Sequence, residues 1–333
     1  MRSPSQSPPR HPVLAHLTPA SPADTSPLPM RRPTVLADFD GVWIDMRGQA
    51  HAVVSGTHQR LASLCHADPE SIRADLDRAR AVVRSAPQAH GWRIDGRITA
   101  WSDEDPFLFH NATMGACDQL AEQGDSGMVR MLEAVRNAGH ASLNAFGSAI
   151  FSEASHAWLD DHGHDLLPGA LEALRALTEV ADVVFCTNFA SEAVARTWTR
   201  HGVTFSPPGT PGPLRLRGGA RKQNLTHDPP RDESFAGRNI PVDRGFYRSI
   251  LLEERPDVVI GDVFSLDLAL PIVMKRETPG FERLRTVLMR TPFSCAWSLG
   301  LADPPSPTIE LADHPCRLVD IAREAARQEV PPC

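Results

Sequence analysis

Acidic side chains gather in the stretch "VLADFDGVWIDM", residues 35–46, where Asp38 and Asp40 directly follow a short apolar run. A carboxylate can attack phosphorus and form an acyl phosphate. A second carboxylate two residues along an extended segment returns to the same side, where it can protonate a leaving alcohol and then activate water. Gly41 allows the backbone to turn sharply there. For Asp38 alone, a turn at the end of a strand would be the simpler interpretation. A catalytic role therefore needs support from residues elsewhere in the chain.

Short apolar runs predict the strands that would position these acids. Each run is rich in Val or Ile and ends in polar or glycine residues: 34–39, 181–188, 256–262 and 285–291. Helical patterns lie between them, at 168–180, 191–202 and 244–255. Alternating strands and helices are typical of an α/β fold with a parallel sheet covered on both faces.

The predicted strand ends carry a set of polar side chains. Ligands of open parallel sheets bind outside the carboxyl ends of the strands. Three strands deliver groups to that edge: Asp38 and Asp40, then Thr187 and Asn188, then Asp262 with Asp267 five residues later. Clustered carboxylates repel one another unless a cation joins them. Mg²⁺ takes one or two carboxylates together with substrate phosphate and water, so we expect a magnesium site here.

Residues 46–167 interrupt the alternation of strands and helices. Helical patterns at 68–85 and 127–139 and the Asp-Gly hairpin signal within 93–99 predict a mostly helical second domain inserted into the first. The methionines of this segment, Met128 and Met131, are expected to pack in its core. The first domain would then consist of residues 34–45 and 168–327.

Two segments look irregular. The sequence of residues 206–241 predicts a long irregular loop within the core, and loops of that length are often functional. Residues 1–33 are rich in proline and serine and are expected to form a disordered tail.

Composition narrows the class of protein. The net charge of −7 argues against a nucleic-acid partner. Six scattered cysteines without a CxxC pair favour reduced thiols in the cytoplasm. No apolar run approaches the roughly 18 residues of a membrane span, so no membrane partner is expected. The sequence does not indicate an oligomeric state.

Three segments, "DFDGVWID", "VFCTN" and "VIGDVFSLD", resemble in order and spacing three of the four signature motifs of the haloacid dehalogenase-like (HAD) superfamily. The resemblance extends over about residues 34–325. It implies a Rossmann-like sheet with a cap domain, and a cap commonly lies between the first two motifs, where residues 46–167 are found.

The resemblance also implies roles for the residues of the first two motifs. Asp38 would be the nucleophile, and Asp40 the general acid and base whose backbone carbonyl also binds Mg²⁺. Thr187 would donate a hydrogen bond to the phosphoryl group, assisted by the backbone of Asn188. Asp45 matches a common acidic position without a chemical step, and we expect it to cap a helix.

The remaining roles concern the metal and a cation. Asp262 would bind Mg²⁺ directly, and Asp267 would support it directly or through water. The superfamily also places a Lys or Arg beside the nucleophile. Lys222 is of the usual type but lies in the long loop, whereas Arg244 lies at the usual place; we prefer Lys222.

These implications lead to one expected function. The chain would be a cytoplasmic, Mg²⁺-dependent phosphatase that hydrolyses a small phosphorylated metabolite through an aspartyl-phosphate. A phosphomutase or another HAD-type transferase would use the same residues, and a non-catalytic binding protein would keep the fold. Dehalogenase members generally lack the second aspartate, which is present here as Asp40.

Other features allow both functional and structural interpretations. The basic run of Arg215, Arg217, Arg221 and Lys222 is either a clamp for a phosphorylated or acidic substrate or a solvated loop. The stretch "DHGHD", 161–165, is expected to be a polar loop rather than a zinc site. The stretch "DEDPFLFHNA", 103–112, is expected to begin a helix with buried phenylalanines rather than to contact substrate. Cys186 is expected to be a packed thiol.

Overall fold

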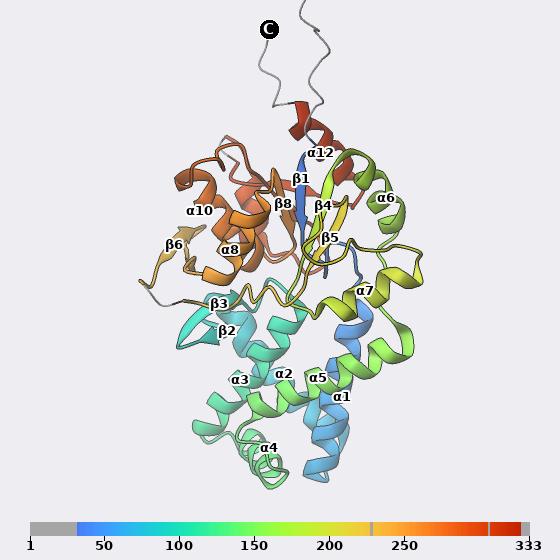
Figure 1. The fold of residues 1–333 in the computed structure, drawn as a ribbon. Coiled ribbons are helices and arrows are strands. Elements are labelled where there is room, and N and C mark those ends of the chain that lie inside the picture. Colours follow the sequence, from blue (N-terminus) through green and yellow to red (C-terminus); the bar gives the residue numbers. More distant parts are fainter. Residues whose placement is uncertain (1–31, 227–228, 306, 328–333) are drawn as a thin grey trace, which may run out of the picture. The chain divides into compact units, whose positions relative to one another are not determined.

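The computed structural model describes residues 32–226, 229–305 and 307–327. Their centre is a six-stranded sheet in the order β10-β9-β8-β1-β4-β5, in which every paired strand is parallel (Figure 1). The strands are β1 (Thr34–Ala37), β4 (Asp182–Cys186), β5 (Leu214–Arg217), β8 (Val258–Gly261), β9 (Arg285–Met289) and β10 (Glu310–Ala312). The predicted α/β parallel sheet is thereby confirmed.

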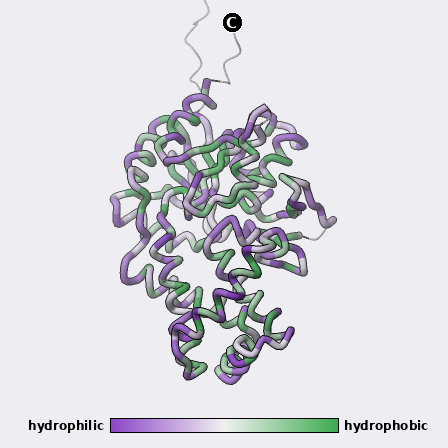
Figure 2. Tube along the Cα trace, turned by 180° about the vertical axis from the view of Figure 1, so that it is seen from behind, coloured by the Kyte–Doolittle hydropathy of each residue, from purple (hydrophilic) through white to green (hydrophobic). Residues whose placement is uncertain are grey.

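Helices cover both faces of the sheet because side chains alternate along each strand. Val35 and Phe185 face α6 (Ala170–Val180), α7 (Ser191–Arg200) and α12 (Arg317–Arg327). Leu36 and Val184 face α8 (Gly245–Glu254) and α10 (Ala269–Glu277), with α9 (Phe264–Asp267) between β8 and α10. Figure 2 shows hydrophobic residues in the interior of this core and hydrophilic residues along its outer helices.

Of the helices between β1 and β4 in the chain, the five that precede α6 share a hydrophobic core of their own. They are α1 (Arg47–Cys65), α2 (Pro69–Ser85), α3 (Pro106–Glu122), α4 (Ser126–Asn137) and α5 (Leu143–His162), with the 3₁₀ turn η1 (Pro87–Ala89) after α2. Met128 and Met131 are buried in this core, as predicted. Several of these helices begin at a capping side chain: Asp68 accepts from the backbone of Ser71, and Ser142 from that of Ala145. All five helices fall within the segment 46–167; its status as a separate domain stays a prediction.

The Asp-Gly signal gives a hairpin, as predicted. β2 (Gly91–Ile94) pairs antiparallel with β3 (Arg97–Trp101). Asp95 and Gly96 form the turn with φ of 49° and 80°, the left-handed conformation that two-residue hairpin turns require.

The prediction of an irregular region at 206–241 is wrong in part. β5 lies in this region and adds a strand to the sheet beside β4, and β6 (Asp232–Phe235) and β7 (Arg238–Pro241) form a second hairpin. The predicted strands did not include β5 or β10. After β9 come α11 (Ala296–Leu299) and the 3₁₀ turn η2 (Gly300–Ala302).

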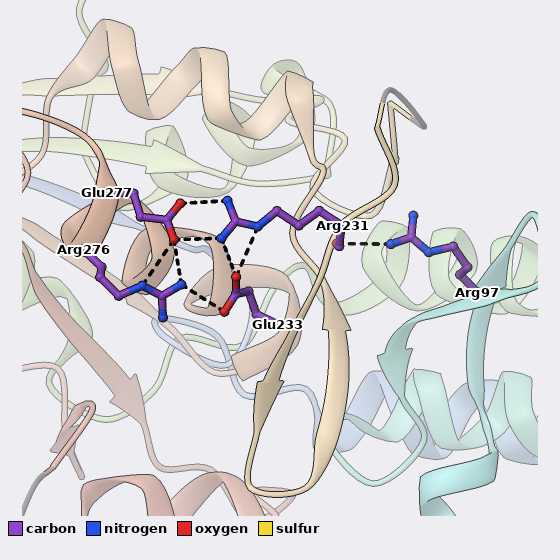
Figure 3. A network of polar contacts seen from close by, with 5 residues as sticks. All are labelled: Arg97, Arg231, Glu233, Arg276 and Glu277. Carbon is purple, nitrogen blue, oxygen red and sulfur yellow. Dashed lines mark hydrogen bonds and ion pairs between the residues drawn. The ribbon is translucent and has the colours of Figure 1, made fainter.

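The second hairpin is fixed by ion pairs on one side and meets the inserted segment on the other. Arg231 and Arg276 both pair with Glu277 and with Glu233, which lies on β6 (Figure 3). The backbone carbonyl of Arg231 accepts a hydrogen bond from Arg97 of β3 at 3.2 Å. This hairpin therefore links β3 to the core.

Two expectations about the chain as a whole remain. Residues 1–31 of the expected disordered tail lie outside the described residues. Among the helices that the structure describes, none combines the length and the apolar character needed to cross a bilayer.

Candidate active site

Asp38 and Asp40 lie where β1 ends and the chain turns. The backbone N–H of Asp38 donates to the carbonyl of Ile260 in β8 at 2.9 Å, which extends the pairing of the two strands by one residue. The carbonyl of Asp40 then accepts from Val42 N–H at 2.7 Å. The chain therefore folds back directly after the two acids, and both line one cavity.

Gly41 allows the close approach of Asp262 to this turn. Its φ of +64° is one that residues with side chains rarely adopt. A Cβ at this position would lie only 2.0 Å from Oδ2 of Asp262. Glycine therefore places the first strand end against the carboxylate that follows β8.

Four aspartates lie together at the strand ends. Asp38, Asp262 and Asp267 each offer a carboxylate oxygen, and these oxygens lie within 4.8 Å of one another. Oδ1 of Asp40 and Oδ2 of Asp262 are buried, and the described residues provide no hydrogen-bond donor for them. Such oxygens need a cation or a proton, and a hard divalent ion such as Mg²⁺ suits this all-oxygen set.

The same crowding shifts the acid equilibria of these groups. Burial raises the pKa of Asp38 to about 6, although the charge of Lys222 opposes the rise. Burial and then the charge of Asp38 raise the pKa of Asp40 well above its ordinary range. Burial and then the charge of Asp267 do the same for the pKa of Asp262. Protons or a cation must therefore compensate these carboxylates.

Lys222 provides a positive charge inside this cluster. Its Nζ lies 2.9 Å from Oδ1 of Asp38 and 2.7 Å from Oδ1 of Asp267, and the residue is 2% exposed. Burial opposes the charged ammonium, but the charges of Asp267 and Asp38 outweigh it and raise the pKa of Lys222. The other oxygen of Asp267 accepts from the backbone N–H of Val263 at 3.1 Å. Asp267 therefore holds the lysine against the expected nucleophile.

Arg244, the other candidate for this role, makes different contacts. It is 1% exposed and donates to three backbone carbonyls: Pro241 at 2.9 Å, Lys222 at 2.5 Å and Thr99 at 2.7 Å. Burial lowers the pKa of Arg244 to about 10. The structure thus places Lys222 beside Asp38, whereas Arg244 supports the backbone of Lys222 and joins it to β3.

The end of β4 contributes a hydroxyl and an amide. Thr187 is buried, and its Oγ1 accepts from the backbone N–H of Phe189 at 3.1 Å, so its hydroxyl proton remains for another acceptor. Asn188 accepts from the backbone N–H of Lys222 through Oδ1 at 2.8 Å and lines the cavity. The loop that carries Lys222 is therefore tied to this strand end.

A cavity of about 540 Å³ opens above these groups. Its wall includes Asp38, Asp40, Asp262 and Asn188 from the strand ends and one face each of α3 and α5. This volume lies in the range of small-molecule sites. The cavity therefore connects the acidic cluster with the inserted helices.

The segment 103–112 begins a helix, as expected, and it also lines the cavity. Asp105 caps α3 by accepting from the backbone of Phe107 at 2.8 Å and of Leu108 at 3.0 Å, as expected for a helix start. The expectation of buried phenylalanines is wrong, because Phe107 and Phe109 are only half-buried. Asp105, Phe107, His110 and Asn111 line the cavity. Burial raises the pKa of Asp105 to about 6. The lining residues of α5 were not predicted, because its sequence shows no motif that distinguishes a cavity wall from a packed helix face.

The other candidate residues lie outside this cluster. Arg215 and Arg217 pair with the buried Glu254 at 2.5 and 2.6 Å, and Arg221 stacks on Phe246. Of the basic run, Lys222 alone pairs with a carboxylate of the cluster in the described structure.

Three smaller predictions concern the stretch 161–165, Asp45 and Cys186. Within 161–165, His164 bonds Thr197 and packs on Phe39, and the described residues hold no metal-binding group there. Asp45 accepts from the backbone N–H of Arg47 at 3.0 Å, but the N-cap of α1 is Met46, which makes no capping side-chain bond, so the expected capping role of Asp45 is wrong. Cys186 is fully buried, and burial raises its thiol pKa to about 12.

No protein-family model matches the chain, and no curated protein matches it either. Solved structures resemble it over most of its length. One is a candidate HAD-hydrolase, YfnB from Bacillus subtilis, bound to magnesium, with 13% identity, 88% of this chain and 99% of that chain covered and a TM-score of 0.41. Another is the haloacid dehalogenase-like family protein SP0104 from Streptococcus pneumoniae, with 12% identity, 87% and 98% covered and a TM-score of 0.41.

A third similar structure is the 2-haloacid dehalogenase from Pseudomonas syringae, with 12% identity, 88% and 99% covered and a TM-score of 0.40. HAD-type proteins recur among the structures similar to this chain.

Proposed function

We propose that this chain is a Mg²⁺-dependent, HAD-like hydrolase that cleaves phosphate monoesters of small metabolites. The observation that supports this function best is the position of Asp38. Its carboxylate lies against Lys222 at 2.9 Å and lines a cavity large enough for a metabolite. The alternating α/β fold and the three acidic strand ends are consistent with the proposal.

In the first step a carboxylate oxygen of Asp38 attacks phosphorus in line with the leaving oxygen. The new O–P bond forms an aspartyl-phosphate, and the bond between phosphorus and the alcohol oxygen breaks. Asp40 delivers the proton that the departing alkoxide needs, and its raised pKa favours the protonated form that can do so. Lys222 balances the charge of Asp38, and the hydroxyl of Thr187 donates to a phosphoryl oxygen.

In the second step Asp40, now ionised, removes a proton from water. The water oxygen attacks phosphorus, and inorganic phosphate leaves as the carboxylate of Asp38 is restored. Mg²⁺ would be held by Asp38, Asp262 and the backbone carbonyl of Asp40, with Asp267 in support, and would supply positive charge for the phosphoryl oxygens.

We also propose a reducing compartment such as the cytoplasm. The cysteines that the structure describes (65, 117, 186, 295 and 316) are all free thiols. Reduced thiols are the usual state in that compartment.

Phosphate release tests the proposed reaction. Wild type is incubated with an aryl phosphate and a panel of metabolite phosphates, with Mg²⁺ or with EDTA, beside Asp38→Asn. Asp45→Asn is the matched control, because it makes the same change between the turn and α1, outside the acidic cluster. We expect release to need Mg²⁺, to survive in the control and to fall by at least about 10³ in Asp38→Asn.

Turnover by folded Asp38→Asn at the wild-type rate would eliminate Asp38 as nucleophile. Transfer of phosphate to a second hydroxyl, detected by product analysis, would replace the hydrolase with a transferase that uses the same residues.

A further inference from the structure

The far end of the cavity is formed by helix faces rather than by strand ends. Side chains at spacings of three or four residues share one face of a helix. One face each of α3 and α5 supplies the lining: Phe107, Asn111 and Gly115, and Asn144, Ser148 and Phe151. The cavity therefore has an acidic end at Asp38 and a second end between these helices.

The second end offers rings and neutral hydrogen-bonding groups. Phe107 and Phe151 meet edge to face with their ring centroids 5.2 Å apart. The side-chain amide of Asn144 donates to the backbone carbonyl of Asn111 at 3.1 Å, which leaves the amide oxygen of Asn144 unused. The side chain of Asn111 makes no hydrogen bond to the described residues. A ring with donors and acceptors on its edge would match this wall.

The lining provides little positive charge for an anion at this end. Its one Lys or Arg is Arg93, whose guanidinium already donates to the carbonyls of Gly96 at 2.9 Å and Ala89 at 3.0 Å. His110 is buried, and burial lowers its pKa to about 4, so it is neutral at pH 7. Asp105 lines the cavity where α3 begins, and its carboxylate would repel a second anionic group.

Building on the proposed phosphatase reaction, we propose that the end between α3 and α5 is the leaving-group subsite. It selects uncharged alcohols that carry an aromatic or heteroaromatic ring, and it rejects leaving groups that carry a carboxylate or a second phosphate. Asn111 and Asn144 bind the polar edge of the ring.

Gly115 leaves space in this subsite because it has no side chain. A Cβ built on it would meet only one atom within 4 Å, Nδ2 of Asn144 at 3.7 Å. A methyl group at this position would therefore make only an ordinary contact with Asn144, and a longer side chain would occupy cavity space. Gly147, by contrast, would place a Cβ 2.5 Å from Cγ of Met114 and is unsuited to a test.

Calorimetric binding of phosphonates, which are not hydrolysed, tests the subsite separately from catalysis. The probes are methylphosphonate, phenylphosphonate and 4-carboxyphenylphosphonate, each titrated in the presence of Mg²⁺. For wild type we expect phenylphosphonate to bind about tenfold more tightly than its carboxylated analogue. Gly115→Leu should weaken phenylphosphonate about tenfold and leave methylphosphonate unchanged, because only the ring needs the space beside Gly115.

Two further variants keep the test decisive. Gly56→Ala on α1 is the control for a helical glycine outside the cavity; its Cβ would make ordinary contact with Ala154 at 3.5 Å, and it should bind all probes as wild type does. If Gly115→Leu loses methylphosphonate as well, Gly115→Ala replaces it, with the same order of effects about threefold in size.

Equal or tighter binding of the carboxylated probe would overturn the proposal, and so would unchanged phenylphosphonate binding in the Gly115 variants or its absence in wild type. The expected binding pattern without phosphate release from any ester would retain the subsite and reject the proposed hydrolysis.

Discussion

Replacing Lys222 by methionine tests the electrostatic account of the site most directly. Methionine keeps an unbranched chain of similar length and removes the ammonium that lies between Asp38 and Asp267 at 2.9 and 2.7 Å. At an effective dielectric constant of about 20, each contact corresponds to roughly 6 kcal/mol of Coulomb energy. Burial of the ammonium costs several kcal/mol and offsets much of this gain.

The expected effect is therefore set by the two carboxylates that remain. Removing one partner of a buried ion pair costs about 3–5 kcal/mol. Asp267 has a side chain only 2% exposed, whereas that of Asp38 is 14% exposed and can gain some water. We expect Lys222→Met to lower the free energy of unfolding by about 4 kcal/mol at neutral pH, not by the sum of two pairs.

Urea unfolding followed by tryptophan fluorescence measures this loss, in EDTA so that no metal replaces the missing charge. The sequence contains one other lysine, Lys275, which is exposed on α10. Lys275→Met is therefore the matched control and should change the stability by less than about 0.5 kcal/mol. The double variant Lys222→Met/Asp267→Asn should be more stable than Lys222→Met, because it lacks one uncompensated carboxylate. It should not regain the activity of the wild type.

A loss below about 1 kcal/mol in Lys222→Met would refute this reasoning. It would mean that the carboxylates around Lys222 are already neutral or hydrated, and that the lysine neither holds Asp38 ionised nor stabilises the fold.

Two further variants test other contacts. Gly41→Ala places a Cβ 2.0 Å from Asp262 Oδ2 at a φ of +64°, so we expect a loss of about 1–3 kcal/mol in stability and weaker Mg²⁺ binding by calorimetry; a variant that matches wild type in both would contradict the close approach. Glu104, which precedes α3, is buried and accepts from the backbone N–H groups of Trp101 at 2.9 Å and Ser265 at 2.8 Å. Burial raises the pKa of Glu104 from 4.5 to about 7, so its contribution to stability is complete below pH 4.5 and falls by about 3 kcal/mol as the pH rises through 7. Urea unfolding across this range should show a shallower pH dependence for Glu104→Gln, and an unaltered slope would reject the assignment.

The central strands were predictable because of where they lie. β1, β4, β8 and β9 are covered on both faces, so their sequences read as unbroken apolar runs. β5, with the sequence "LRLR", is an edge strand whose arginines pair with Glu254 on α8. The local sequence of β5 does not indicate these ion pairs. The other missed strand, β10, is only three residues long, which is too short for a clear apolar run. Edge strands depend on tertiary contacts that the local sequence does not contain.

The acidic cluster was predictable for a topological reason. In a parallel sheet the carboxyl ends of all strands meet at one edge, so Asp38 and Asp262 come together although more than two hundred residues separate them. The choice between Lys222 and Arg244 did not follow from topology. The path of the loop after β5 is set by contacts of Lys222 with Asn188 and with Arg244 itself.

The segment 103–112 shows why the cavity wall resisted prediction. Sequence reasoning treated a helix start and a substrate contact as alternatives, but Asp105 caps α3 with one carboxylate oxygen while the residue also lines the cavity. The cap fixes the first turn of α3, and that turn carries Phe107 at the cavity wall. A residue that determines local structure can therefore also determine the shape of the site. A hydrophobic pattern cannot reveal this second role, because a helix face that packs and a helix face that lines a cavity have the same periodicity.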